Sequence, residues 1–115
     1  NSINLPAKLL DKKYLEELKE FCRKVVEFTS HVDFDEFIKD EKLQLAVVKL
    51  IENIGEVSKR LSETARMRYS KVDWKKGMAM RDKLVHDYMD VDLEIVFDVC
   101  SNEIPDLLKN LKMVE

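Results

Sequence analysis

An apolar repeat between residues 43 and 61 restricts the fold more than any other feature of the chain. Its side chains recur in alternating steps of four and three residues, the period of an amphipathic α-helix with one buried stripe. They are Leu43, Val47, Leu50, Ile54, Val57 and Leu61. This spacing predicts a helix from Asp40 or Glu41 to about Leu61, and such a continuous stripe needs a partner helix. With two glycines and two prolines, the chain has few residues for the tight turns of a sheet protein, so we predict an all-α fold.

The remaining helices are predicted from helical spacing and from short polar residues that can cap a helix start. These caps are Asp11, Asp33, Ser62, Asp73, and Asp90 or Asp92. They predict long helices over 11–30, 74–88 and 93–112, short ones over 34–39 and 62–69, and a loosely held lead over 1–10. Pro105 lies inside the last pattern, so we expect a kink near residues 101–104. The prediction is an antiparallel four-helix bundle with short additional helical turns, in which residues 1–115 form a single domain.

Composition points to a well-patterned cytoplasmic protein. Hydrophobic residues make up 45% and charged residues 37% of the 115 positions, a balance typical of soluble helical domains. Cys22 and Cys100 lie within apolar helical patterns and lack metal-ligand spacing, so we expect buried free thiols in a reducing compartment. No secretory signal or membrane-spanning run is visible. We therefore expect no membrane partner, no metal and no cofactor.

Charge is distributed unevenly along the chain, although the net charge is only −3. Between residues 59 and 83 there are nine Lys and Arg against three Asp and Glu, a local charge of +6. This basic segment suits a phosphate-bearing ligand, although it could also be a solvated charged face. The candidate residues within it for binding such a ligand, RNA if the chain acts on nucleic acid, are Arg66, Arg68, Lys75, Lys76 and Lys83.

The basic segment leads into the sequence MRDKLVHDY at residues 80–88, which holds Arg81, Asp82, His86 and Tyr88. Arginine is a forked, permanently charged donor that suits phosphate, and histidine exchanges protons near neutral pH. On an unbroken helix, however, His86 points roughly 140° away from Arg81 and lies over Asp82, which could orient its imidazole. Either the last turn unwinds after Val85, or a second copy of the helix completes the site.

Metal-free cleavage of a phosphodiester needs two groups that handle protons, a base for the attacking hydroxyl and an acid for the leaving oxygen. The chain has two histidines, and His31 follows the first predicted helix, where a surface or helix-end position is the plain expectation. A dimer would bring two copies of His86 and Arg81 into one cleft. The residues alone also permit a purely structural role, with His86 favoured by the helix dipole and Arg81 in an ion pair.

Two further features of the sequence bear on the site. Gly55 falls inside the helix predicted over 43–61, where it costs about 1 kcal/mol relative to alanine, so we expect another backbone to approach closely there. Tyr69 and Trp74 could stack RNA bases, although Trp74 is also a good core residue.

The chain resembles the HepT-like toxins of the HEPN superfamily from about residue 12 to residue 112. The resemblance is carried by the segment around Ile54-Gly55-Glu56, by Trp74 and Gly77, and by the Arg-x4-His-x-Tyr motif of Arg81, His86 and Tyr88. It implies a HEPN bundle that forms a homodimer, with both motifs in a cleft that cleaves RNA without metal.

The resemblance also implies a type VII toxin–antitoxin pair. The partner would be a minimal nucleotidyltransferase antitoxin that silences the toxin by adenylylating Tyr88. It makes Arg81 and His86 catalytic, with Asp82 in support. Two other functions stay open on the residues alone. One is a non-catalytic helical module that docks a nucleotidyltransferase or binds nucleotide, and the other is a dimerisation domain with no active site.

Overall fold

The computed structural model describes residues 4–87 and 91–113, and for residues 4–8 and 84–87 it describes the backbone only. The described chain is helical and contains no β-strand, which confirms the predicted all-α class. The elements are α1 (Asn4–Thr29), α2 (Phe34–Ile38), α3 (Glu41–Arg60), α4 (Glu63–Arg68), α5 (Trp74–Asp87), α6 (Leu93–Asp98), a π-helical turn η2 (Val99–Glu103) and α7 (Ile104–Lys112). None of these helices is long and apolar enough to cross a membrane.

Side-chain caps set the starts of most helices where the sequence predicts them. Each capping oxygen accepts a backbone N–H two or three residues further on, which satisfies a donor that has no partner within the helix. The caps are Asp33, Asp40, Ser62, Asp73 and Asp92. Local sequence therefore determines where these five helices begin.

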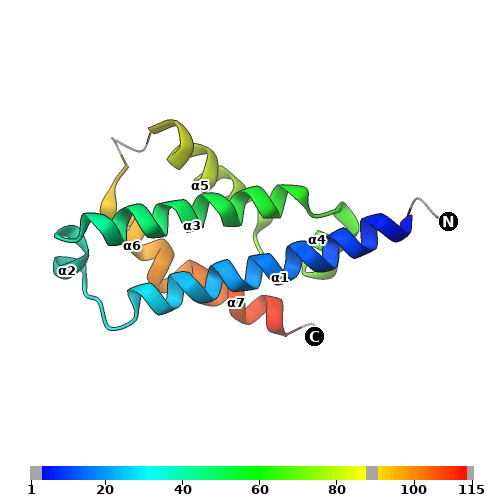
Figure 1. The fold of residues 1–115 in the computed structure, drawn as a ribbon, viewed down its shortest axis with the longest axis horizontal. Coiled ribbons are helices and arrows are strands. Elements are labelled where there is room, and N and C mark those ends of the chain that lie inside the picture. Colours follow the sequence, from blue (N-terminus) through cyan, green and yellow to red (C-terminus); the bar gives the residue numbers. More distant parts are fainter. Residues whose placement is uncertain (1–3, 88–90, 114–115) are drawn as a thin grey trace.

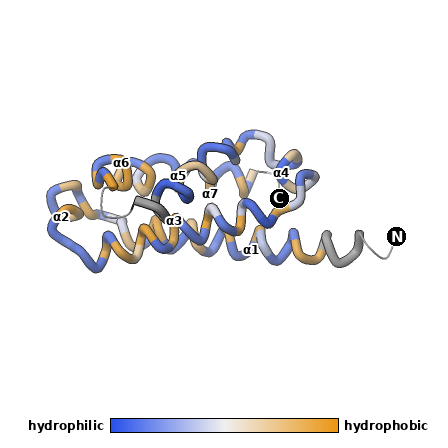
Figure 2. The backbone as a smooth tube through the Cα atoms, turned by 90° about the horizontal axis from the view of Figure 1, so that it is seen from above, coloured by the Kyte–Doolittle hydropathy of each residue, from blue (hydrophilic) through white to orange (hydrophobic). Residues whose placement is uncertain are grey.

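Helices α1 and α3 form the long axis of the molecule and lie side by side (Figure 1). Hydrophobic and hydrophilic stretches alternate along both helices, as expected of amphipathic helices that share a core (Figure 2). Helix α7 also packs against α1, and α2 inserts Phe37, which is fully buried and has its ring centroid 5.3 Å from that of Phe97. The apolar seam of α3 is buried in this core from Val47 to Leu61, as its spacing predicts.

The last long helix is interrupted before Pro105, as predicted. Pro105 has no N–H to donate to the carbonyl four residues back, so a regular α-helix loses a hydrogen bond there. The backbone instead forms the π-helical turn η2, in which the N–H of Ile104 donates to the carbonyl of Val99, five residues back. The missing N–H of Pro105 therefore accounts for the π-helical turn.

The start of α1 differs from the prediction. The helix begins at Asn4, seven residues before Asp11, because Pro6 falls in the first turn, where backbone N–H groups lack helical partners anyway. The Asp11 carboxylate is not a cap. Its two oxygens accept hydrogen bonds from the backbone N–H and the hydroxyl of Ser62, at 2.9 and 2.6 Å, and tie α1 to the start of α4.

Both cysteines are buried free thiols, as predicted. Burial raises the pKa of Cys22 and of Cys100 to about 12, because a thiolate would lose its hydration in the apolar core. These thiols are therefore part of the packing.

Candidate active site

Helix α5 carries the Arg-x4-His motif and lies along α3 (Figure 1). Its start is fixed by Asp73, whose carboxylate accepts the N–H of Lys76 at 3.1 Å. The indole N–H of Trp74 donates to the carbonyl oxygens of Arg66 and Tyr69, at 3.0 and 3.2 Å, and fastens α5 to the end of α4. The core interpretation of Trp74 is therefore supported, because its polar atom is used within the fold.

Gly55 lets the backbones of α3 and α5 meet at Arg81. A Cβ atom added to Gly55 would lie 2.2 Å from Cβ and 2.6 Å from Cγ of Arg81, closer than any stable contact, and 3.5 Å from the carbonyl oxygen of Gly77. The predicted close approach at Gly55 is confirmed. The base of the Arg81 side chain occupies the space that a side chain at position 55 would fill.

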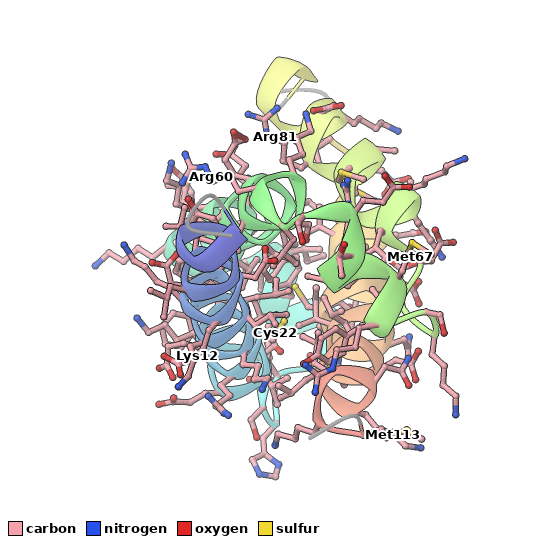
Figure 3. All side chains as sticks on the ribbon, turned by 90° about the vertical axis from the view of Figure 1, so that its right-hand side faces the viewer. Lys12, Cys22, Arg60, Met67, Arg81 and Met113 are labelled. Atoms are coloured by element: carbon pink, nitrogen blue, oxygen red, sulfur yellow. The ribbon has the colours of Figure 1, made fainter. Side chains whose placement is uncertain are left out.

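The guanidinium of Arg81 lies on the side of α5 that faces α3 and forms ion pairs with two carboxylates (Figure 3). Its Nη1 donates to Oδ1 of Asp82 at 2.8 Å, and its Nη2 lies 2.5 Å from Oε2 of Glu56 in an ion pair. The hydrogen bond to Asp82, with the nearby charge of Glu56, raises the pKa of Arg81 above its ordinary value. With its side chain only 22% exposed, Arg81 is held in one position.

Asp82 is shared between two cations. Its Oδ1 accepts from Arg81 and also from Nζ of Lys59 at 2.9 Å, and these two hydrogen bonds, Arg81 first, lower the pKa of the carboxyl below its ordinary value. In this structure the described partners of Asp82 are therefore cations. Its predicted role as orienter of His86 stays a prediction, because side chains from 84 to 87 lie outside the description.

His86 is placed by its backbone alone, and Tyr88 lies outside the described residues. Helix α5 continues unbroken through Asp87, so the unwinding considered after Val85 does not occur within it. The side chain of residue 86 lies outside the description, so completion of the site by a second copy stays a prediction.

The five candidate RNA-binding residues have different surroundings. Lys75 and Lys83 are exposed on α5, and the exposed Arg68 lies on α4 with its guanidinium carbon 5.9 Å from the ring centroid of Tyr69. Arg66 is half-buried, with Nη1 3.9 Å from the Met78 sulfur. The structure therefore leaves Lys75, Lys83 and Arg68 accessible to a polyanion.

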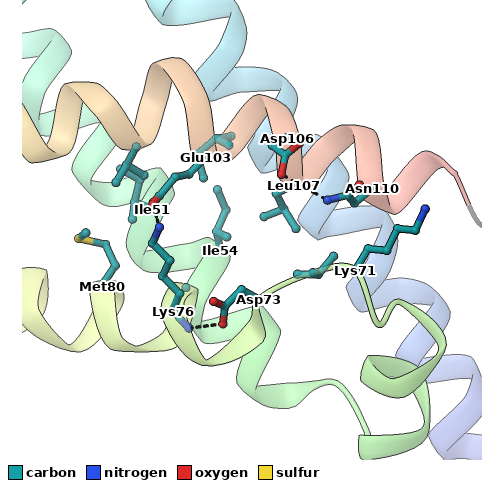
Figure 4. A pocket seen from close by; sticks show the side chains of 14 residues that line it. Ile51, Ile54, Lys71, Asp73, Lys76, Met80, Glu103, Asp106, Leu107 and Asn110 are labelled. Carbon is teal, nitrogen blue, oxygen red and sulfur yellow. Dashed lines mark hydrogen bonds and ion pairs between the residues drawn. The ribbon is translucent and has the colours of Figure 1, made fainter.

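Lys76 is engaged within the fold, at a pocket apart from Arg81. It forms an ion pair with Glu103 across a pocket of about 210 Å³ between α5 and the η2–α7 segment, above Ile51 and Ile54 (Figure 4). The hydrogen bond with Glu103 raises the pKa of the Lys76 ammonium. The structure does not bring Lys76 together with Arg81.

Tyr69 is not available to stack on a base. Its side chain is 4% exposed and belongs to the core, because the turn after α4 folds it inward. The suggestion that Tyr69 stacks RNA bases is therefore wrong for this structure. The other histidine, His31, is exposed just after the end of α1, with φ of 61°, which confirms its predicted helix-end place.

Two residues of the cluster, Glu56 and Lys59, were not among the predicted site residues. Both lie on α3 beside Gly55 and meet Arg81 and Asp82 through side chains. The signal in the sequence is a second stripe at helical spacing, formed by Glu52, Glu56 and Lys59, on a face other than the apolar seam. A polar stripe next to a helix-interior glycine indicates a contact with another helix.

Comparison with known proteins identifies the family of the chain. Residues 12–114 match the family described as Ribonuclease HepT-like. A Methanocaldococcus jannaschii protein named as a candidate RNase is 37% identical over 101 residues, 88% of this chain and 84% of the relative. A similarly named protein of Caldanaerobacter subterraneus subsp. tengcongensis is 39% identical over 101 residues, 88% of this chain and 90% of the relative.

A third relative, from Thermococcus cleftensis, is named Probable ribonuclease HepT and is 35% identical over 96 residues, 84% of this chain and 87% of the relative. No solved structure matches the chain. The helical bundle with its Arg-x4-His-x-Tyr sequence is of the HEPN kind. The chain belongs to the HepT-like ribonuclease family of the HEPN superfamily.

Proposed function

We propose that this single-domain protein is a metal-independent endoribonuclease whose active site combines Arg81 and His86 from two subunits of a homodimer. The observation that carries the proposal is the way α3 holds Arg81. A helix-interior glycine gives up helix stability so that a guanidinium can sit in a fixed, ion-paired position. A preorganised cation of this kind stabilises the charge that develops on a phosphate during cleavage. The ribonuclease names of the relatives support the same activity.

The proposed reaction uses the 2′-hydroxyl of the substrate as its nucleophile. His86 of one subunit removes the 2′ proton, and the second His86 protonates the 5′-oxygen as it leaves, while Arg81 neutralises the phosphorane. Asp82, four residues before His86 on the same helix, orients its imidazole. Lys75, Lys83 and Arg68 contribute exposed positive charge for the RNA backbone, with smaller contributions from Arg66 and Lys76.

Regulation is proposed to follow the family pattern of a type VII toxin–antitoxin pair. The antitoxin, a minimal nucleotidyltransferase, would transfer AMP from ATP to the hydroxyl of Tyr88 and release pyrophosphate. AMP adds bulk and negative charge two residues beyond His86, and both oppose entry of RNA. Incubating the protein with its nucleotidyltransferase and ATP should add the mass of one AMP, and Tyr88→Phe should remove that product.

The activity is tested by cleavage of single-stranded RNA in excess EDTA. Wild type should cut, whereas Arg81→Ala and His86→Ala should lose activity and remain folded dimers. Arg23→Ala is the matched control, since Arg23 is an exposed arginine paired with Glu20 on α1. A wild-type dimer that binds a nucleotidyltransferase or nucleotide but never cuts RNA would contradict the proposal and favour a binding module.

A further inference from the structure

The cations at the Arg81 site differ in how freely they can reach a substrate. Arg81 uses Nη1 on Asp82 and Nη2 on Glu56, and its Nε is enclosed with no hydrogen-bond partner among the described residues. Lys59 has a more open ammonium, with its side chain 38% exposed and one described contact, to Asp82. An ammonium has three donors, so Lys59 keeps donors for another acceptor.

Asp82 marks where such an acceptor would bind. Its Oδ1 lies 2.8 Å from Nη1 of Arg81 and 2.9 Å from Nζ of Lys59, so one anionic oxygen already bridges both cations. A phosphate oxygen is the same kind of acceptor and forms the same charge-assisted hydrogen bonds. The Asp82 side chain is 49% exposed and can turn toward solvent when a phosphate takes its place.

We infer that Lys59 is a second phosphate-binding residue for RNA, which acts with Arg81 on a phosphate oxygen at the position held by Oδ1 of Asp82 in the free protein. The inference rests on the proposed ribonuclease function and adds one residue to its site. Glu56 keeps Arg81 in place during the exchange, because its ion pair uses the other nitrogen, Nη2. Asp82 then acts as an internal competitor of the phosphate.

The inference predicts that replacing Lys59 and replacing Asp82 change the affinity for RNA in opposite directions. Lys59→Gln removes a phosphate ligand and should weaken RNA binding about tenfold, the value of one charge-assisted hydrogen bond. Asp82→Asn removes the competing charge and should tighten binding. A contact that only stabilised the fold would not move binding in opposite directions when each partner is replaced.

Binding is measured in a His86→Ala background, with a short single-stranded RNA and fluorescence anisotropy at several salt concentrations. Adding Lys59→Gln should reduce the slope of log affinity against log salt by about 0.7, as expected for one lost phosphate contact on a single strand. Lys59→Arg should retain the slope. Lys24→Gln, at an exposed lysine of α1, is the control and should also retain it. Circular dichroism checks that each variant is folded.

The outcomes separate this inference from the proposed function. If wild type cleaves RNA and Lys59→Gln matches Lys24→Gln in affinity and salt slope, Lys59 binds no phosphate and the inference is wrong. If Asp82→Asn weakens binding as Lys59→Gln does, the pair is structural and the inference fails as well. If wild type neither cuts nor binds RNA, the proposed function fails and the inference falls with it.

Discussion

Two faces of helix α3 differ in how they meet their neighbours. The face toward the core consists of apolar side chains that are almost fully buried: Val47, Leu50, Ile54 and Val57. The face toward α5 carries Glu52, Gly55, Glu56 and Lys59, and it meets α5 through a close backbone approach and ion pairs. The first face excludes water, and the second holds charged groups in fixed positions at the surface.

The difference separates stability from function along a single helix. Burial of apolar area contributes most of the free energy of folding, whereas exposed ion pairs contribute little. Substitutions on the polar face should therefore change the free energy of unfolding little. They should change the position of the Arg81 side chain, and with it the activity, much more. The core face should show the reverse, and the predictions below test this division.

The largest effect on stability is expected on the core face. Leu50→Ala should lower the free energy of unfolding by about 2–5 kcal/mol, because it removes buried methyl groups and leaves a cavity. RNA cleavage by the folded fraction should change little. Urea unfolding and cleavage, both measured at low temperature, check this. A loss of cleavage that exceeds the loss of folded protein would contradict the division between the faces.

Among substitutions on α3, the largest effect on activity is expected at Gly55. In Gly55→Ala the new Cβ would meet the Cβ of Arg81, so α5 must shift, and a displacement of about 1 Å can lower catalysis about 100-fold. Gly77→Ala is the matched control, since an added Cβ there has no described atom within 4 Å. That control should keep activity and raise the free energy of unfolding by about 0.5–1 kcal/mol. Equal activities of the two variants would show that the contact at Arg81 is unimportant.

The buried thiols give the core face a dependence on pH. Cys22 and Cys100 ionise near pH 9 when unfolded but near pH 12 in the fold. Below pH 9 the neutral thiols therefore leave the free energy of unfolding unchanged. As the pH rises from 9 toward 12, that free energy falls by about 1.4 kcal/mol per pH unit for each thiol. Between pH 8 and 11 the free energy of unfolding should therefore fall more steeply with pH for wild type than for the double variant Cys22→Ala/Cys100→Ala. Equal slopes of the free energy of unfolding against pH would mean that the thiols are not shielded from water.

The smallest effect is expected at Glu56. Glu56→Gln keeps the shape of the side chain but loses its charge, so Arg81 is held less firmly and kcat should fall several-fold. Thermal unfolding should barely change, since the pair is partly exposed. Steady-state kinetics beside a melting curve measure both quantities. A large fall in melting temperature with unchanged kcat would place Glu56 among the stabilising residues.

Much of the fold could be predicted because its determinants are local. The α3 seam, the capping residues and Pro105 act within a few residues of themselves, and each produced the expected element. Gly55 was also readable, because a glycine inside a helix needs a reason. The start of α1 was missed because Asp11 is a good cap in isolation but is used 51 residues away, on Ser62.

The site was predictable only in part, because its contacts join two helices. Arg81 stands out through its spacing to His86. Its ion pair with Glu56, and the ion pair of Asp82 with Lys59, depend on how α5 rotates against α3. The burial of Tyr69 likewise depends on the turn after α4. Such contacts follow from tertiary packing, which residue spacing alone does not determine.

The central claim is that the His86 side chains of both subunits work in one shared active site. It is tested most directly with a mixed dimer of one wild-type and one His86→Ala subunit, isolated through an affinity tag on each subunit. Because the account needs one His86 as the base and the other as the acid, it predicts that this dimer cuts RNA in EDTA at only a small fraction of the wild-type rate. A mixed dimer that keeps about half of the wild-type activity would contradict it, because each subunit would then carry a complete site of its own.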